Sequence, residues 1–215
     1  ITINYEDYKR AKKHMHSNNI EYVPGVGINL SKFDNLNVKK SEKRKELGIP
    51  EDAFLMLSVG ELNENKNHQT VIKAIDGMDV YYIIAGLGPK CNELQNLISQ
   101  QNMTDKIKLL GYRNDVLELY AASDIFIFPS YREGLSVSVM EAMASGLPCV
   151  VSKIRGNTDL IDENGGILFN PYDVNELALV LKNINVADMG DYNKNKIKTF
   201  DIKNVLQRMK EIYNI

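Results

Sequence analysis

The sequence is poor in the features that mark a membrane, secreted or nucleic-acid-binding protein. Its 215 residues carry 26 lysines and arginines against 28 aspartates and glutamates, so no excess of positive charge indicates a nucleic-acid partner. No apolar run approaches the roughly 20 residues that a transmembrane helix needs, and the first residues, ITINYEDYKR, lack the pattern of a secretion signal. The two cysteines, Cys91 and Cys149, show no metal-ligand spacing, and we expect a reduced protein of the cytoplasm.

Short apolar runs alternate with stretches of helical spacing from Ser41 onward. The runs are apolar throughout, which is typical of strands buried on both faces of a parallel sheet. The predicted strands are residues 54–59, 80–85, 107–110, 125–128, 149–151 and 166–169. Strands separated by helices require crossover connections, so we predict an α/β fold, a doubly wound, mainly parallel, Rossmann-like sheet with helices on both faces. The polar stretch 189–198 is expected to be a loop or a frayed helix start.

The stretch from Pro129 to Ser152, PSYREGLSVSVMEAMASGLPCVVS, is the most informative part of the sequence. It follows an apolar run that ends in Pro and Ser, so it is expected at the carboxyl edge of a strand. A helix is predicted from Leu135 to Ser145. The backbone N–H groups of Gly134, Leu135 and Ser136 then lie at the start of this helix, where they suit an anion or a phosphate.

Two carboxylates in this stretch stand in unusual surroundings. Glu133 lies in the predicted loop, and Glu141 lies on a helix among small and apolar residues. A carboxylate in apolar company needs hydrogen-bond donors. Both are therefore candidate site residues, although Glu133 pairing with Arg132 or Lys153 on the surface, and Glu141 emerging at a helix edge, would explain them equally well from spacing alone.

The wording E-G-L-S-x-S-x-M-E-A-M-A-S-G-L-P-C-V resembles the signature of the retaining nucleotide-sugar glycosyltransferases of the B-fold type, the family often called group 1. The resemblance covers the loop, the helix, its glycine stop and the next strand. In that family the first Glu lies beside the donor sugar, the N–H groups after it meet the sugar or diphosphate, and the second Glu accepts hydrogen bonds from the ribose hydroxyls. The resemblance implies these roles for Glu133, for Gly134 through Ser136, and for Glu141.

The loop after the first predicted strand, residues 60–68, places Lys66 where a helix begins. A mobile ammonium there suits a diphosphate, although a solvated lysine at a helix start is the plainer interpretation of Lys66 alone. The loop also resembles the family pattern V-G-x-L-x-x-x-K-N, which ends in K-G in other members, with Gly60 and Lys66 at the matching positions. The resemblance implies that Gly60 and Lys66 bind the donor, and that Lys66 and Glu133 are catalytic residues.

Glu61 departs from the family, because many members carry Arg or Lys at this position. A carboxylate beside the diphosphate would repel it. We therefore predict that Glu61 turns away from the phosphates, toward Lys66 or toward solvent.

Two further loops follow predicted strands. Gly86–Pro89 is either a tight turn before a helix or a ligand contact, because no third glycine completes a dinucleotide fingerprint. The loop Gly111–Asp115 resembles the place where the family seats the nucleotide base, and there Tyr112 or Arg113 is expected to stack on the base. The alternative for this loop is an ordinary helix cap with an exposed Tyr.

The opening of the chain resembles the middle of a longer protein, because it starts without Met in a strand-like segment. Residues 1–3 and 20–23 are predicted as strands, and residues 5–15 as a basic amphipathic helix. On that helix His14 and His16 are two residues apart and point in different directions, so we expect both on the surface.

Residues 24–29 resemble the passage between the two domains of the family. Gly25 and Gly27 allow the backbone changes that a hinge needs, although a plain turn is the alternative. We predict that residues 1–30 form the last strand-helix unit of an acceptor-side N-terminal domain plus the hinge, and that residues 31–215 form the nucleotide-sugar donor-binding domain.

The resemblance implies transfer of a sugar from a nucleoside-diphosphate donor, for which we expect a UDP-sugar, to a hydroxyl acceptor with retention. The expected acceptor is a lipid-linked or polysaccharide sugar in cell-surface polysaccharide or glycoconjugate synthesis. We expect no cofactor, no nucleic acid and no metal, since no Asp-x-Asp pair occurs. We expect a location in the cytoplasm at the inner face of the membrane, with peripheral association through the N-terminal domain, and no turnover by this chain alone. A non-catalytic nucleotide-binding module, or an epimerase or hydrolase of nucleotide sugars, are the alternatives.

Overall fold

A six-stranded parallel sheet forms the centre of the protein. The computed structural model describes residues 1–17, 19–34 and 38–215. The strands are β1 (Leu55–Val59), β2 (Tyr81–Ala85), β3 (Ile107–Gly111), β4 (Ile125–Phe128), β5 (Cys149–Ser152) and β6 (Gly166–Phe169). Their order is β3-β2-β1-β4-β5-β6, and every neighbouring pair is parallel. The predicted doubly wound, Rossmann-like sheet is confirmed.

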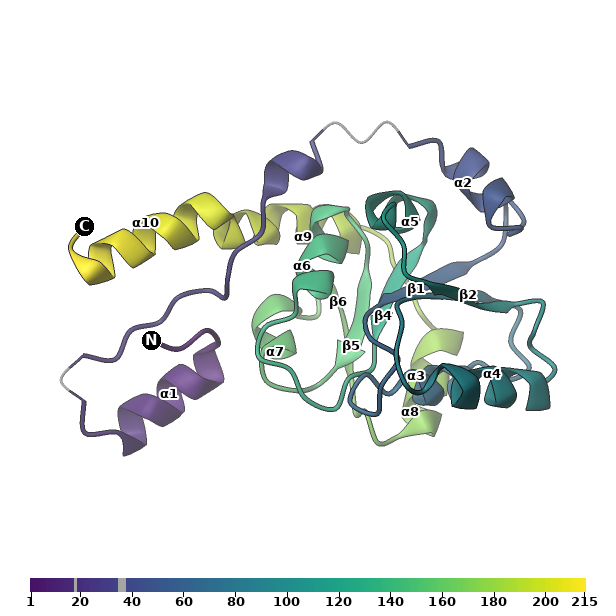
Figure 1. Ribbon diagram of the computed structural model, residues 1–215, viewed down its shortest axis with the longest axis horizontal. Coiled ribbons are helices and arrows are strands. Elements are labelled where there is room, and N and C mark those ends of the chain that lie inside the picture. The colour runs from purple at the N-terminus through teal and green to yellow at the C-terminus, as the bar shows by residue number, and fades with distance from the viewer. Residues whose placement is uncertain (18, 35–37) are drawn as a thin grey trace.

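Helices cover both faces of this sheet (Figure 1). The helices of the described residues are α1 (Tyr5–His14), α2 (Lys40–Glu46), α3 (His68–Ala74), α4 (Cys91–Gln100), α5 (Val116–Ala122), α6 (Val137–Ala144), α7 (Asn157–Leu160), α8 (Val174–Lys182), α9 (Met189–Lys196) and α10 (Ile202–Tyr213), with 3-10 turns at Leu30–Lys32 and Ile197–Phe200; α1 and α10 lie to one side of the sheet (Figure 1). Helix α3 packs against α4 and α8 on one face, while α2 packs on α5 and α6 on α7 and α9 on the other.

Both faces of the strands are apolar because both are covered. In β1, Leu55 and Leu57 belong to the cluster that α5 and α6 cover, whereas Met56 belongs to the cluster that α3, α4 and α8 cover. Successive strand residues point to opposite faces, so a strand with two buried faces contains no polar alternation. This is why the strands appear in the sequence as continuous apolar runs.

One polar chain interrupts the core below the carboxyl end of β1. The Ser58 Oγ lies 2.7 Å from the Tyr82 hydroxyl and 2.5 Å from the carbonyl oxygen of Ile127, and the Tyr82 hydroxyl lies 3.3 Å from His68 Nδ1. Burial lowers the pKa of His68 to about 4, so the ring is neutral near pH 7. The chain ties the first residue of α3 to β1, β2 and β4.

The two ends of the chain lie at the same end of the molecule, beside α1 and α10 (Figure 1). Thr2 and Tyr22 form an isolated bridge, as do Ile28 and Asp201. The strands predicted at residues 1–3 and 20–23 are therefore wrong beyond this single bridge, because each segment pairs only with the other at one position. The prediction that His14 and His16 lie on the surface is confirmed.

Two helical segments differ from the prediction. The polar stretch expected as a loop or a frayed helix start forms α9 and a 3-10 turn, and the buried Asn193 fixes it by donating to the carbonyl oxygens of Leu147 and Gly165, 2.7 Å from each. Helix α2 was not predicted. Its residues are charged or polar and show no apolar period, since ion pairs rather than an apolar stripe hold this helix in place.

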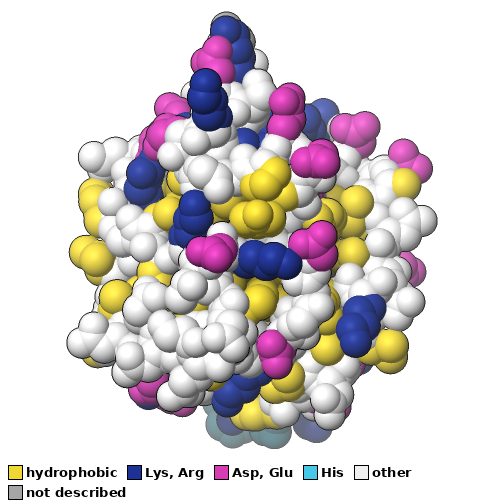
Figure 2. Space-filling model, turned by 90° about the vertical axis from the view of Figure 1, so that its right-hand side faces the viewer, with side chains coloured by type: hydrophobic (Ala, Val, Ile, Leu, Met, Phe, Trp, Pro, Cys, Tyr) yellow, Lys and Arg dark blue, Asp and Glu magenta, His cyan; other side chains and the backbone are white. Residues whose placement is uncertain are grey.

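The surface carries charges of both signs. On the face drawn in Figure 2, basic and acidic side chains are interspersed around hydrophobic side chains in the middle of the face. Within residues 1–17, 19–34 and 38–215, no helix combines the length and apolar character needed to cross a bilayer.

Candidate functional site

Strands β1 and β4 are neighbours in the sheet, but the chain leaves them in opposite directions, since β2 lies beyond β1 and β5 lies beyond β4. Such a reversal marks the part of the carboxyl edge where open α/β sheets bind ligands. The loop after β1, residues 60–67, and the loop after β4, residues 129–136, therefore face each other. Both contain residues that the sequence predicts as site residues.

Lys66 and Glu133 meet at this edge of the sheet. The Lys66 ammonium lies 2.7 Å from Glu133 Oε1, and the two side chains are 19% and 15% exposed. The ammonium also lies 4.6 Å from the centre of the Phe128 ring, a distance at which a cation is attracted to the ring face. Of the partners considered for Glu133, neither Arg132 nor Lys153 pairs with it among the ion pairs of the described residues. The structure thus brings together the two residues predicted as catalytic.

The loop that carries Lys66 is closely fixed. The backbone N–H of Lys66 donates to Asn63 Oδ1 at 2.9 Å. Asn65 donates to the carbonyl oxygen of Arg132 at 2.9 Å and accepts from the N–H of Tyr131 at 2.8 Å. A Cβ on Gly60 would lie 3.4 Å from Lys66 Cε. Gly60 therefore lies directly beneath the lysine stem, at the start of a loop that is tied to its neighbour.

The helix after Glu133 starts two residues later than predicted, because Ser136 is its N-cap. Helix α6 begins at Val137, and Ser136 Oγ accepts from the N–H of Val139 at 3.4 Å. The N–H groups of residues 134–138, which include Gly134 and Leu135, donate to no other group among the described residues. These N–H groups and the positive end of the helix dipole are suited to an anion.

Glu141 lies beside a cavity rather than on open surface. The cavity has a volume of about 450 Å³ and is lined by Gly27, Ile28, Asn29, Lys32, Phe33, Asn114, Val116, Leu117, Val137, Glu141 and Ile202. Burial raises the pKa of the Glu141 carboxyl, against the effect of the Tyr120 hydroxyl, which donates to Oε2 at 3.2 Å. The carboxylate thus has free acceptor capacity at the wall of a cavity with space for a ligand.

Tyr112 and Arg113 differ in their freedom to meet a ligand. The Tyr112 ring is 74% exposed. Arg113 donates from Nη2 to Asp115 and to Glu46, the latter at 2.8 Å, and these carboxylates raise the pKa of the guanidinium. Of the two residues predicted to stack on a base, Arg113 is thus held by other groups.

Glu61 and the glycine pair at 86 and 88 have simple structural explanations. Glu61 is exposed and accepts from Asn63 Nδ2 at 2.8 Å, while Lys66 pairs with Glu133 instead. A Cβ on Gly86 would lie 1.9 Å from the carbonyl oxygen of Gly60, and one on Gly88 would lie 2.4 Å from that of Leu62. Close backbone packing against the Lys66 loop therefore requires these glycines.

Arg155 is a residue of this edge that the sequence did not predict. It follows β5, and its Nε donates to the carbonyl oxygen of Glu133 at 3.2 Å while Nη1 pairs with Asp7 of α1 at 2.9 Å. The next residue, Gly156, has φ +79°, and a Cβ there would lie 2.1 Å from the carbonyl oxygen of Gly134. The position of Arg-Gly at the carboxyl end of a predicted strand was the available signal.

A cluster of charge near α2 resembles a metal site at first sight. Oxygen atoms of Glu46, Asp115 and Glu118 lie within 4.8 Å of one another. The Lys43 ammonium lies among them, at 2.5, 2.8 and 2.6 Å respectively, and Arg113 holds the pKa of Asp115 well below its usual range. Lysine therefore occupies the position that a cation would take.

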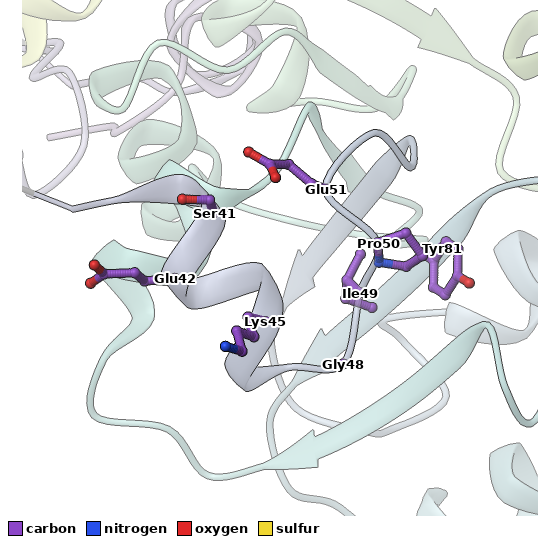
Figure 3. A pocket seen from close by; sticks show the side chains of 8 residues that line it. All are labelled: Ser41, Glu42, Lys45, Gly48, Ile49, Pro50, Glu51 and Tyr81. Carbon is purple, nitrogen blue, oxygen red and sulfur yellow. The ribbon is translucent and has the colours of Figure 1, made fainter.

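Another hollow lies at the opposite edge of the sheet, near the amino ends of β1 and β2. It has a volume of about 530 Å³ and is lined by Ser41, Glu42, Lys45, Gly48, Ile49, Pro50, Glu51 and Tyr81. In Figure 3, Ile49, Pro50 and Tyr81 lie together, while Ser41, Glu42 and Lys45 lie across from them on α2. Its polar groups converge on no common point, in contrast to those around Lys66.

One protein family matches the part of the chain that contains the sheet and the loops at its carboxyl edge. A sequence profile described as "Glycosyl transferases group 1" matches residues 39–186. A UDP-Gal:alpha-D-GlcNAc-diphosphoundecaprenol alpha-1,3-galactosyltransferase of Escherichia coli is 31% identical over 99% of this chain and 59% of its own length. The putative glycosyltransferase EpsD of Bacillus subtilis (strain 168) is 30% identical over 78% of this chain and 46% of its own. The chain thus spans about half the length of these relatives.

Solved structures show the same fold. The structure of Anabaena Alr3699/HepE in complex with UDP superposes with a TM-score of 0.88 at 20% identity, over 99% of this chain and 62% of that one. WaaG, a glycosyltransferase involved in lipopolysaccharide biosynthesis, superposes with a TM-score of 0.76 at 20% identity, over 98% of this chain and 61% of that one. These proteins therefore share the parallel sheet and its two helical layers with this chain, although their sequence identity to it is low.

Proposed function

Because this chain belongs to the group 1 glycosyl transferases, we propose that it is the donor-binding part of an enzyme that transfers a sugar from a UDP-sugar to a hydroxyl acceptor with retention. The observation that carries the proposal is the meeting of Lys66 with Glu133 at 2.7 Å, beside the unpaired N–H groups at the start of α6 and the cavity at Glu141. Lys66 with the row of backbone donors matches the diphosphate of a UDP-sugar, Glu133 matches the sugar, and the Glu141 carboxylate matches the ribose.

The proposed chemistry is electrostatic. The bond between the anomeric carbon and the diphosphate oxygen breaks, its electron pair leaves with the diphosphate, and the acceptor oxygen forms its bond on the same face of the sugar while its proton departs. Negative charge grows on the diphosphate in the transition state. Lys66 and the N–H groups of residues 134–138 stabilise that charge without having to reorganise. Glu133 lies beside the donor sugar.

The nucleoside occupies the cavity at Glu141. The carboxylate accepts hydrogen bonds from the ribose hydroxyls, and the base lies toward the loop after β3, where the exposed Tyr112 is free to stack on it. Arg113 serves to hold that loop to α2, since both of its carboxylate partners are in place.

The remaining proposals concern the whole enzyme. We assign residues 1–30 to the last unit of an acceptor-side domain plus a hinge, and residues 31–215 to the donor domain. The name of the E. coli relative combines a UDP-sugar with a lipid-linked acceptor, which supports a lipid-linked or polysaccharide acceptor at the inner face of the membrane. The acceptor-side domain orients the acceptor and excludes water, so this chain alone binds the donor without turning it over.

Calorimetry with UDP and a panel of UDP-sugars tests the donor site. Glu141→Ala is expected to weaken UDP binding by about 1.5–3 kcal/mol, because a charged acceptor of hydrogen bonds is lost. Glu133→Ala is expected to leave UDP binding intact and to weaken the preference for a UDP-sugar. Glu163→Ala, at an exposed position, is the control. Equal losses in the two site variants would refute the assigned roles, and inversion of the anomeric configuration by the whole enzyme would refute retention.

A further inference from the structure

Asn67 lies between Lys66 and the first residue of α3 in an unusual backbone conformation. Its φ and ψ are 52° and 32°, the left-handed region that glycine and asparagine adopt at little cost. The backbone alone would accept either residue here. The side chain gives a further reason for asparagine, because Asn67 is only 1% exposed.

The Asn67 amide joins three loops at the carboxyl edge of the sheet. Nδ2 donates to the carbonyl oxygen of Pro129 at 3.1 Å and to that of Pro171 at 3.0 Å. Oδ1 accepts from Thr70 Oγ1 at 2.8 Å. Both carbonyl groups can only accept, so the orientation of the amide is fixed. One side chain therefore connects the loops after β1, β4 and β6.

These connections bear directly on the two charged residues of the site. Asn67 follows Lys66 in the chain, and Pro129 begins the loop that leads to Glu133. Asn65 also links the two loops, but its hydrogen bond to the carbonyl oxygen of Arg132 is exposed. The bonds of Asn67 are buried, so water cannot replace them without entering the core.

We propose that Asn67 is a positioning residue, which fixes the loop of Lys66 against the loop of Glu133 and so places the Lys66 ammonium for the donor diphosphate. The inference rests on the proposed function, because it takes the diphosphate as the group that Lys66 meets. Glycine at this position would keep the backbone and lose the link. The Pro129 and Pro171 carbonyl oxygens would then be left without their donor, and the Lys66 loop would be free to move.

A double-mutant cycle separates positioning from general stabilisation. UDP binding is measured by calorimetry for this chain, Asn67→Gly, Lys66→Met and the double variant. Asn67→Gly is expected to weaken UDP binding about five- to tenfold when Lys66 is present and less than about twofold in the Lys66→Met background, because residues that act through one another are not additive. Asn102→Gly is the matched control. Asn102 also has a left-handed φ, 55°, but its side chain is exposed and it belongs to none of the loops that Asn67 connects.

The outcomes are distinct. If the unaltered chain fails to bind UDP, the proposed function fails before the cycle begins. If UDP binds and Asn67→Gly causes the same loss in both backgrounds, or none, the positioning role is refuted.

Asn67→Asp covers the case in which the glycine variant does not fold. Its carboxyl donates to a carbonyl oxygen when protonated and repels both when ionised, so its UDP affinity relative to the unaltered chain is expected to fall as pH rises. A ratio that does not change with pH would contradict the proposal.

Discussion

Lys43 and Lys66 are two largely buried lysines in very different company. Lys43, 8% exposed, has three carboxylate partners, Glu46, Asp115 and Glu118. Lys66, 19% exposed, has one, Glu133, and otherwise faces the Phe128 ring. Burial opposes the charge on Lys43, but its three hydrogen bonds raise the pKa of the ammonium overall.

The difference lies in spare capacity. An ammonium has three N–H donors, and Lys43 has used all of them to hold α2 against the loop before α5 and α5 itself. Lys66 has used one and lies beside further unpaired donors at residues 134–138. A saturated cluster stabilises a fold, whereas a cluster with free donors at the carboxyl edge of a sheet is prepared for an anion. Four predictions test this distinction.

The largest effect is expected from Lys43→Met. Three carboxylates within 4.8 Å would lose their shared cation, so the free energy of unfolding should fall by about 3 kcal/mol, as when a buried ion pair loses one partner. UDP affinity of the folded variant should not change. Urea denaturation and calorimetry measure the two quantities, and a stable variant that loses UDP would invert the comparison.

Lys66→Met should show the opposite pattern. UDP affinity is expected to fall by about 2 kcal/mol, because a charge-assisted contact to the diphosphate is lost. The free energy of unfolding should change by less than it does for Lys43→Met, since Lys66 has one carboxylate partner and Lys43 has three. Lys73→Met, at an exposed position on α3, the helix that follows the Lys66 loop, controls for the loss of charge. Unchanged UDP affinity in the Lys66 variant would show that the diphosphate does not bind at Lys66.

Glu141→Gln tests the site through the pH dependence of the free energy of unfolding. Its folded pKa is raised by burial, so the unfolded chain ionises first, and the wild-type free energy of unfolding should decrease as pH rises above the ordinary value of this group. The Gln variant should lack this decrease. UDP binding should weaken by about 1 kcal/mol, because a neutral acceptor replaces a charged one. Denaturation at several pH values gives the slope, and a parallel slope in both proteins would contradict the assignment.

Glu61→Arg should have the smallest effect. Glu61 is exposed and turned to Asn63, so a cation in its place should raise UDP affinity by only about 0.5 kcal/mol. The gain should disappear as salt is added, because an exposed ion pair is screened. Glu163→Arg controls for net charge. A gain that persists at high salt would mean a buried contact rather than an exposed one.

The sequence was informative where local pattern decides structure. Continuous apolar runs predicted all six strands to within two residues at either end, and the Glu133 to Glu141 spacing located the unit around α6. The pairing of Lys66 with Glu133 could not be predicted, because residues 67 positions apart meet only when β1 and β4 become neighbours. The start of α6 was placed too early, since the Ser136 cap rather than the apolar pattern decides where the helix begins.

Other misses have the same physical origin. Helix α2 has charged residues in place of an apolar stripe, and its stability comes from Lys43 and its distant partners. Arg155 has only the Arg-Gly pair after a predicted strand as a local signal, because its partners, Asp7 and the Glu133 carbonyl, are 148 and 22 positions away. The local periodicity of a sequence gives no information on contacts between residues so far apart.

The polar chain below β1 allows two of its protons to be located by counting. Ser58 has one proton, and its neighbour at 2.5 Å, the Ile127 carbonyl oxygen, can only accept. Tyr82 then gives its proton to Ser58. The tautomer of His68 decides whether Nδ1 donates to the Tyr82 oxygen, 3.3 Å away. With only three histidines in the chain and the other two exposed, its ring nitrogens are a built-in nuclear magnetic resonance reporter of whether α3 is seated on the sheet.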